Sequence, residues 1–144
     1  MAATSFVSLS YPKTRESMEK VVKVVRTDTT AFVGAWLPKD AVITGMYVIG
    51  QAASDAATSA SISVGTTATA NELLDTFDVK TAATGEGYNP AGAAAVGAAF
   101  MEKLTSDNPI YAKYVEAGTA SSAGGPWYVK IEYSVVGSGE NIQL

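Results

Sequence analysis

Apolar and polar residues alternate most regularly near the end of the chain, from Trp127 to Val136. Successive side chains of a strand point to opposite faces, so this alternation predicts a strand with one buried face. The residues expected on the buried face are Trp127, Val129, Ile131, Tyr133 and Val135, and those expected on the other face are Tyr128, Lys130, Glu132 and Ser134.

Shorter runs predict further strands. The β-branched residues at positions 20–26 favour a strand over a helix. Two strands are expected on either side of Pro38, because proline cannot donate a hydrogen bond to a strand ladder. The second of these should place Val42, Thr44, Met46 and Val48 on one face and Ile43, Tyr47 and Ile49 on the other. Short strands are also expected at residues 61–65 and 110–115, with turns at 106–109 and 116–118.

One segment predicts a short helix. Thr69 or Asn71 can cap its start, and Glu72 and Asp75 would then lie near its positive end. The apolar residues that fall at helical spacing are Leu73, Leu74 and Phe77.

Together these elements predict an all-β fold. Short strands separated by Gly, Pro, Asn and Asp turns are typical of an antiparallel β-sandwich or a jelly-roll-like fold, and a partly open barrel is the alternative. A chain of 144 residues is in the size range of one domain. We expect residues 1–17 to form an extended N-terminal arm, although terminal segments are often poorly ordered. Residues 18–136 should form the sandwich, and residues 137–144 a flexible tail.

The composition removes much of the common catalytic chemistry. The chain has no cysteine and no histidine, which excludes Ser-His-Asp and Cys-His catalysis and thiolate metal sites. We therefore expect no enzymatic activity, no cofactor and no metal. A small hydrolase that uses paired carboxylates stays open as an alternative, because two acids suffice for glycoside hydrolysis. Its candidates would be Glu72, Asp75 and Asp78.

Charge is unevenly distributed along the chain. Residues 1–26 carry five basic and two acidic side chains, a net of +3, whereas the remaining residues carry five basic and twelve acidic ones, a net of −7. This segment could dock on an acidic protein surface, or its cations could simply be the solvated face of a strand. The candidate docking residues are Lys13, Arg15, Lys20, Lys23 and Arg26.

Two other classes of partner are not expected. The body of the chain lacks recurring basic clusters interleaved with aromatic residues, so nucleic acid is not an expected partner. No run approaches the roughly 18 apolar residues that would span a membrane, and the start of the chain lacks the organisation of a signal peptide. These features favour a protein made in the cytoplasm that later joins an assembly.

A glycine-rich stretch at residues 80–99 reads as a long loop, which is uncommon in a compact domain unless it has a function or a partner. Small side chains allow close approach of another subunit, so this stretch is either a subunit-contact loop or a flexible surface loop. The candidate contact residues are Tyr88, Asn89, Pro90, Ala91 and Gly92.

Aromatic side chains leave a sugar-binding module open, because sugar rings stack on Trp and Tyr faces. The candidates are Trp36, Tyr88, Tyr111, Tyr114, Trp127 and Tyr128. Trp127 is expected in the core instead, because it shares its face with Val129 and Ile131.

Three stretches in succession resemble small structural proteins of tailed-bacteriophage virions, above all the head decoration, or cement, proteins. The stretches are "LPKDAVITGMYV", "ASISVGTTATANELLDTFDV" and "DNPIYAKYVEAGTASSAGGPWYVKIEYSV". The resemblance covers about residues 30–135 and consists of strand-and-turn patterns.

The resemblance implies a β-sandwich or jelly-roll protein that binds the outside of an expanded capsid. Such proteins contact the major capsid protein, often as homotrimers, and clamp neighbouring capsomers, with no catalytic residues and no small-molecule substrate. The basic residues at 13–26 would then be a capsid-docking arm. Some members of the wider group lie in the neck or tail instead, or carry immunoglobulin-like or sugar-binding extensions.

Overall fold

The computed structural model describes residues 18–81, 87–88 and 103–136. The expected arm at 1–17 and tail at 137–144 lie outside the described residues. The strands are β1 (Met18–Val24), β2 (Phe32–Leu37), β3 (Ala41–Gly50), β4 (Ser59–Gly65), β5 (Leu74–Asp78), β6 (Gly87–Tyr88), β7 (Asn108–Ala117) and β8 (Trp127–Val135). No helix that is long and apolar enough to cross a membrane occurs in these described ranges.

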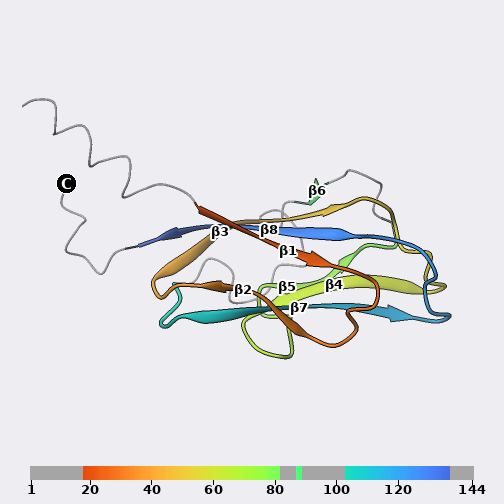
Figure 1. The fold of residues 1–144 in the computed structure, drawn as a ribbon, viewed down its shortest axis with the longest axis horizontal. Coiled ribbons are helices and arrows are strands. Elements are labelled where there is room, and N and C mark those ends of the chain that lie inside the picture. Colours follow the sequence, from red (N-terminus) through yellow and green to blue (C-terminus); the bar gives the residue numbers. More distant parts are fainter. Residues whose placement is uncertain (1–17, 82–86, 89–102, 137–144) are drawn as a thin grey trace, which may run out of the picture.

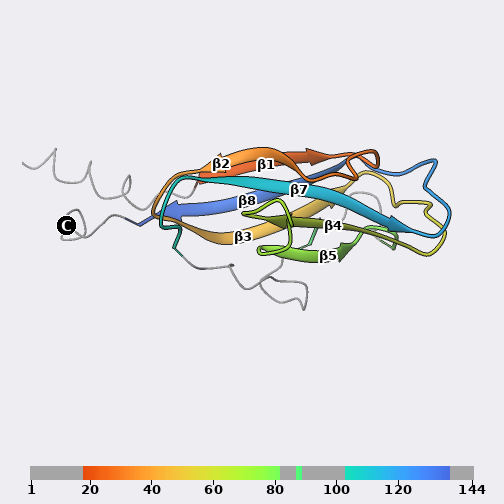
Figure 2. The ribbon, with the colours of Figure 1, turned by 90° about the horizontal axis from the view of Figure 1, so that it is seen from below.

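The strands form two four-stranded antiparallel sheets, which confirms the expected β-sandwich (Figures 1 and 2). Sheet A has the order β1-β8-β3-β6, and sheet B has the order β2-β7-β4-β5. Consecutive strands lie in different sheets, except β4 and β5, which are neighbours in sheet B. β8 lies beside β1 in sheet A, and β7 lies beside β2 in sheet B. One apolar core fills the space between the two sheets.

Strand β8 has the buried face that its alternation predicts. Trp127, Val129 and Ile131 are fully buried, and Tyr133 is nearly so. Val135 packs against the core at the end of the strand. β8 pairs with β1 on one side and β3 on the other, so it is an internal strand, which explains why alternation is so regular there.

The predicted face of β3 is wrong for the first half of the strand. The ladder with β8 shifts register between Ile43 and Gly45, and this bulge leaves Thr44 as an extra, exposed residue. A bulge reverses the alternation on its two sides. Ile43 is therefore buried together with Met46 and Val48, whereas Val42 is only half-buried.

The predicted helix after Thr69 is also wrong. Leu73 and Leu74 are both buried, but Leu74 begins β5, and Leu73 donates its N–H to the Val64 carbonyl oxygen at 3.0 Å. Positive φ angles at Ala70 (55°) and Thr76 (52°) interrupt a helical path on both sides of these leucines. The apolar spacing that suggested a helix is produced by an irregular strand, whose ladder with β4 contains a register shift.

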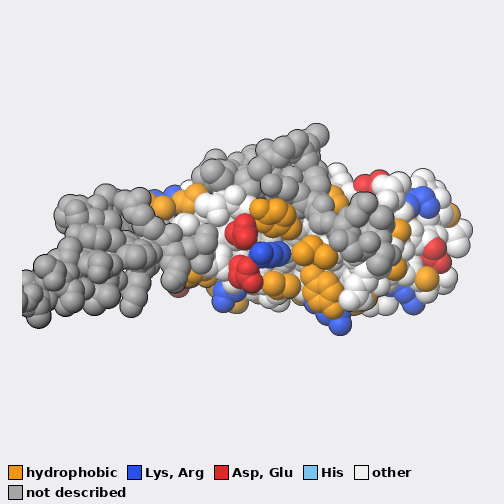
Figure 3. Space-filling view, turned by 90° about the horizontal axis from the view of Figure 1, so that it is seen from above, with side chains coloured by type: hydrophobic (Ala, Val, Ile, Leu, Met, Phe, Trp, Pro, Cys, Tyr) orange, Lys and Arg blue, Asp and Glu red, His pale blue; other side chains and the backbone are white. Residues whose placement is uncertain are grey.

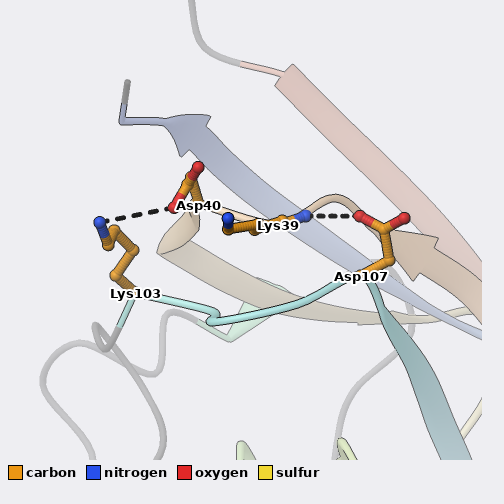
Figure 4. A network of polar contacts seen from close by, with 4 residues as sticks. All are labelled: Lys39, Asp40, Lys103 and Asp107. Carbon is orange, nitrogen blue, oxygen red and sulfur yellow. Dashed lines mark hydrogen bonds and ion pairs between the residues drawn. The ribbon is translucent and has the colours of Figure 1, made fainter. Parts of the chain in front are cut away.

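The two strands expected around Pro38 are confirmed as β2 and β3. The turn expected at residues 106–109 ends earlier, because β7 already begins at Asn108, and Pro109 lies opposite Trp36 on β2. Polar contacts tie the β2–β3 turn to the residues that precede β7 (Figure 4). The Lys39 N–H donates to Asp107 at 2.8 Å, and the Lys103 ammonium lies 3.4 Å from the Asp40 carboxylate.

Candidate functional site

The three candidate docking cations that the structure describes, Lys20, Lys23 and Arg26, do not gather on one surface. Lys13 and Arg15 lie outside the described residues. Lys20 and Lys23 are both exposed on β1, but they point to opposite faces, because Lys20 shares its side with the buried Val22. Arg26 donates a hydrogen bond to the Ser121 carbonyl oxygen at 2.9 Å, so it holds a loop of its own chain.

Only the start of the candidate contact loop is described. Tyr88 lies in β6, opposite Val48 of β3, at the edge of sheet A. Asn89, Pro90, Ala91 and Gly92 lie outside the described residues. The contact role of this loop stays a prediction.

The candidate sugar-binding aromatics divide into buried and exposed groups. Trp127 and Tyr114 have no exposed surface, so neither can stack on a sugar. Tyr111 and Tyr128 are half-buried on the outer faces of the sheets. Trp36 is 59% exposed, more than any other large apolar side chain in the described ranges.

The outer face of sheet A carries a compact charge cluster among apolar side chains (Figure 3). The Lys130 ammonium lies 3.3 Å from carboxylate oxygens of both Glu19 and Glu132. Hydrogen bonds to these two carboxylates, first Glu19 and then Glu132, raise the pKa of Lys130. Exposed apolar surface surrounds the cluster: Val21 is 53% and Ile49 is 39% exposed.

The outer face of sheet B is apolar along the edge formed by β2, and Figure 2 shows β2 and its neighbour β7 on this side of the sandwich. Trp36 pairs across the ladder with Pro109, and Val33 pairs with Tyr111. We call these four residues the Trp36 patch. Val33 is 43% exposed, and Val115, further along β7, is exposed to the same extent.

The acidic residues of the described loops act mainly as acceptors for the chain's own N–H groups. Asp55 accepts from the backbone N–H groups of Ser122 (2.8 Å) and Ala123 (2.9 Å) and from the Ser122 hydroxyl. These hydrogen bonds, that from Ala123 first, lower the pKa of Asp55. Asp78 accepts from the Lys80 and Thr81 N–H groups in the same way.

Glu72 is the clearest case. Its carboxylate accepts hydrogen bonds from the Thr66 N–H (3.1 Å), the Thr69 hydroxyl (2.9 Å) and the Thr67 hydroxyl. Burial alone would raise the pKa of Glu72, but the hydrogen bonds, those from Thr67 and from the backbone first, lower it to about 2. A general acid needs a raised pKa. This carboxylate is therefore suited to holding a loop and unsuited to donating a proton in glycoside hydrolysis.

A buried polar network lies at the end of the sandwich where β7 ends. The Tyr114 hydroxyl donates to Glu116 at 2.9 Å, and it lies 2.7 Å from the Ser54 hydroxyl and 3.3 Å from the Ser121 hydroxyl. Glu116 also accepts from the Ser121 N–H at 3.0 Å. Burial, followed by the neighbouring Glu116, raises the pKa of Tyr114, while the hydrogen bonds from Ser121 lower the pKa of Glu116.

The sequence pattern predicts only part of this network. Alternation within 110–115 does place Tyr114 on the same side as Ile110 and Ala112, which are both buried. Of its serine partners, Ser54 is 60 residues away in the sequence and Ser121 lies in the loop that follows β7, and no local pattern marks either of them. The described ranges contain no group of three or more side chains that could hold a metal ion.

Comparison with known proteins identifies a shared fold. No protein-family model matches the chain, and no curated protein matches its sequence. The structure is similar to a chain of the cyanophage Pam1 capsid asymmetric unit, with a TM-score of 0.58 and 17% sequence identity over 85% of both chains. It also aligns with a chain of the acidic stable capsid structure of Helicobacter pylori bacteriophage KHP30, with a TM-score of 0.49 and 15% identity, over 83% of this chain and 91% of that chain. The likeness to the Pam1 chain shows that the two share a fold.

Proposed function

We propose that this chain is a structural protein of a bacteriophage virion. It binds the outer surface of the capsid and stabilises the shell by bridging capsomers, with the major capsid protein as its partner. The observation that carries the proposal is the fold, which a chain of the cyanophage Pam1 capsid asymmetric unit shares over 85% of both lengths. The loose strand-and-turn resemblance to decoration proteins points the same way.

The strand order supports the finer assignment to a jelly roll. In the described strands β1 lies beside β8, β2 beside β7, β3 beside β6 and β4 beside β5, distributed over two sheets. An eight-stranded double sheet built from two Greek keys is the jelly-roll architecture found in viral capsid domains.

The surface of the sandwich suits assembly. Apolar side chains are exposed on the outer faces of both sheets, including Val21 on β1 and Trp36 on β2. Many copies that each bury a modest apolar area can stabilise a lattice through multivalency, without one strong site. We propose that the protein acts as a homotrimer and has no enzymatic activity, no small-molecule substrate, and neither nucleic acid nor membrane as a partner.

Co-sedimentation with expanded, undecorated shells of the phage that encodes the protein tests the proposal. We expect binding to saturate at hundreds of copies per particle and the decorated shells to resist heat or low ionic strength better than bare shells. Saturation at only a few copies would indicate a neck or tail protein, and absence of binding would overturn the capsid role.

The same shells test the docking arm. Replacing Lys13, Arg15, Lys20 and Lys23 with glutamine should weaken binding and reduce its dependence on salt. Arg26 should be kept, because it holds the loop that contains Ser121. Unchanged occupancy and salt dependence would remove the basic segment from the binding surface.

A sugar-binding module is the second candidate, and the exposure of Trp36 beside Pro109 and Tyr111 favours it. Glycan binding that is lost in Trp36→Ser and retained in Tyr128→Ser would support this function.

A further inference from the structure

Strand β2 is an edge of sheet B that carries no charged side chain. Among the described residues it pairs with β7 on one side only. Edge strands of soluble proteins usually carry charged residues, which prevent another strand from pairing with them. Each of the other edge strands has such a feature: β1 carries Glu19, Lys20 and Lys23, β5 carries Asp75 and Asp78, and β6 is only two residues long. β2 has the sequence FVGAWL, without a single charge.

The most exposed apolar side chain lies on this same edge strand. Trp36 is 59% exposed, and across the ladder the Trp36 patch continues onto Pro109 and Tyr111. The bulge at Gly34 interrupts the edge, and a side chain there would collide with Val22 of β1. The backbone available for pairing is therefore residues 35–37, with the Trp36 indole above it.

The chain itself contains a segment that fits this edge. Residues 7–11 read Val-Ser-Leu-Ser-Tyr, so an extended conformation would put Val7, Leu9 and Tyr11 on one face and two serines on the other. No charged side chain occurs before Lys13. Such a strand beside β2 would extend the Trp36 patch with its apolar face and turn its serines toward the β1 side.

The direction in which the chain enters β1 favours a segment from another copy. Met18 begins β1 opposite Tyr133, at the end of the sandwich where β2 finishes at Leu37. Residues 12–17 can span roughly 20 Å. A segment that lies on β2 of its own copy and reaches Met18 through one reversal of direction runs parallel to β2, whereas antiparallel pairing there would need two reversals within residues 12–17. All strand pairs in the described ranges are antiparallel, and parallel pairing is slightly weaker per residue.

We propose that residues 7–11 of one copy add to β2 of a neighbouring copy as an antiparallel strand that covers the Trp36 patch. This inference rests on the proposed function only in that the chain assembles with copies of itself. The contact between residues 7–11 and β2 joins copies of the chain to one another, whereas the capsid contact joins them to the shell. Either contact can therefore be absent while the other is present.

Cross-linking between two cysteine variants tests the inference directly, because the natural chain has no cysteine. Full-length Leu9→Cys is mixed with full-length Val33→Cys of a different tagged mass, and a short thiol cross-linker is added. Full-length Val115→Cys is the matched control, since Val33 and Val115 are equally exposed at 43% on the same face. We expect the mixed product with Val33→Cys to exceed that with Val115→Cys by about tenfold or more, because pairing raises the effective concentration of the thiols.

Two further variants test whether the cross-link depends on the Trp36 patch. Adding Trp36→Ser to the Val33→Cys chain should remove the excess, while Val21→Ser, on the outer face of sheet A, should not. Equal yields at positions 33 and 115 would overturn the proposal. A Leu9→Cys/Val33→Cys chain that forms only an intramolecular link would also overturn it, because the segment would then pair within its own copy.

The outcome is separable from the proposed function. Shell binding without the cross-link would reject the pairing of residues 7–11 with β2 and leave the capsid role intact. The cross-link without shell binding would support the pairing and reject the capsid role. Glycan binding at Trp36 by the intact chain would overturn the proposed strand pairing, because the Trp36 patch would then be accessible to a sugar and not covered by residues 7–11.

Discussion

The ring of Tyr114 on β7 stacks on the indole of Trp127 on β8, with centroids 5.4 Å apart and planes inclined by 12°. The pair joins the two sheets through the interior of the sandwich, since β7 belongs to sheet B and β8 to sheet A. The Tyr114 ring thus contributes to the apolar core, while its hydroxyl holds the polar network at the end of the molecule.

Tyr114→Phe should keep the stacked ring and remove the hydroxyl. The loss removes the hydrogen bonds of this hydroxyl with Ser54 and Glu116, which should lower the free energy of unfolding by about 1–3 kcal/mol. Urea unfolding at neutral pH measures the effect. Tyr111→Phe, on the outer face of sheet B, is the control and should change stability by less than about 0.5 kcal/mol. Equal losses in the two variants would show that the network contributes little.

Gly50→Ala should disturb the packing of the Trp127 indole in the core. A Cβ at position 50 would lie 2.5 Å from Cδ1 of the indole and 2.9 Å from its Nε1, closer than atoms can pack. We expect a loss of about 1–3 kcal/mol, measured by urea unfolding.

Combining Gly50→Ala with Trp127→Phe provides the control for this collision. The smaller ring makes room for the methyl group, so the double variant should lose less stability than the sum of the single ones. The indole N–H is buried without a partner in the described ranges, so Trp127→Phe also removes an unpaired polar group. Strict additivity would mean that the alanine is accommodated by movement elsewhere.

The Glu72 loop should make stability depend on pH. The pKa of Glu72 in the folded chain, about 2, lies below its ordinary value of 4.5, so the folded state favours the charged form. The stabilisation is fully present above pH 4.5 and is lost as the pH falls toward 2. Glu72→Gln should therefore be less stable than the natural chain at neutral pH and nearly as stable near pH 2.

Urea unfolding at several pH values across this window measures the effect. Asp75→Asn, which alters an exposed acid on the neighbouring β5, serves as the control for the general effect of removing one negative charge. If Glu72→Gln and Asp75→Asn had parallel pH profiles, the hydrogen bonds to Glu72 would not be the cause.

Lys130→Gln should have a small effect on stability, despite its two ion pairs. The cluster with Glu19 and Glu132 lies on the surface, where such pairs contribute about 0–1 kcal/mol. Thermal unfolding should show a slight loss at low salt that disappears at high salt, because surface charges are screened. A large loss that persists at high salt would contradict this account.

Alternation predicted those strands whose register is uninterrupted. β8 was predicted from Trp127 onward because its inward residues meet the core on an internal, regular strand. In β3 the single extra residue Thr44 reversed the faces, and nothing in the local pattern marks a bulge. The segment after Thr69 was misassigned because Leu73 and Leu74 are both buried, which imitates helical spacing in a strand with an irregular register.

The exposed surface was harder to predict than the core. The exposure of Trp36 depends on β2 being an edge strand, which follows from the sheet order and not from local pattern. The candidate cations Lys20 and Lys23 are close in sequence, yet strand geometry separates them to opposite faces. Arg26 reaches Ser121 through a contact between distant loops.

The chain enters the sandwich at Met18 and leaves it at Val136 on the same end. Met18 lies opposite Tyr133, and the Val136 N–H donates to the Asp40 carbonyl oxygen at 2.9 Å. The loops that follow Gly50 and precede Trp127 lie at the opposite end, where these two residues are paired. A peptide or reporter domain fused beyond either Met18 or Val136 would therefore be displayed from one pole of the molecule, and the loops of the other pole would stay free for a second insertion.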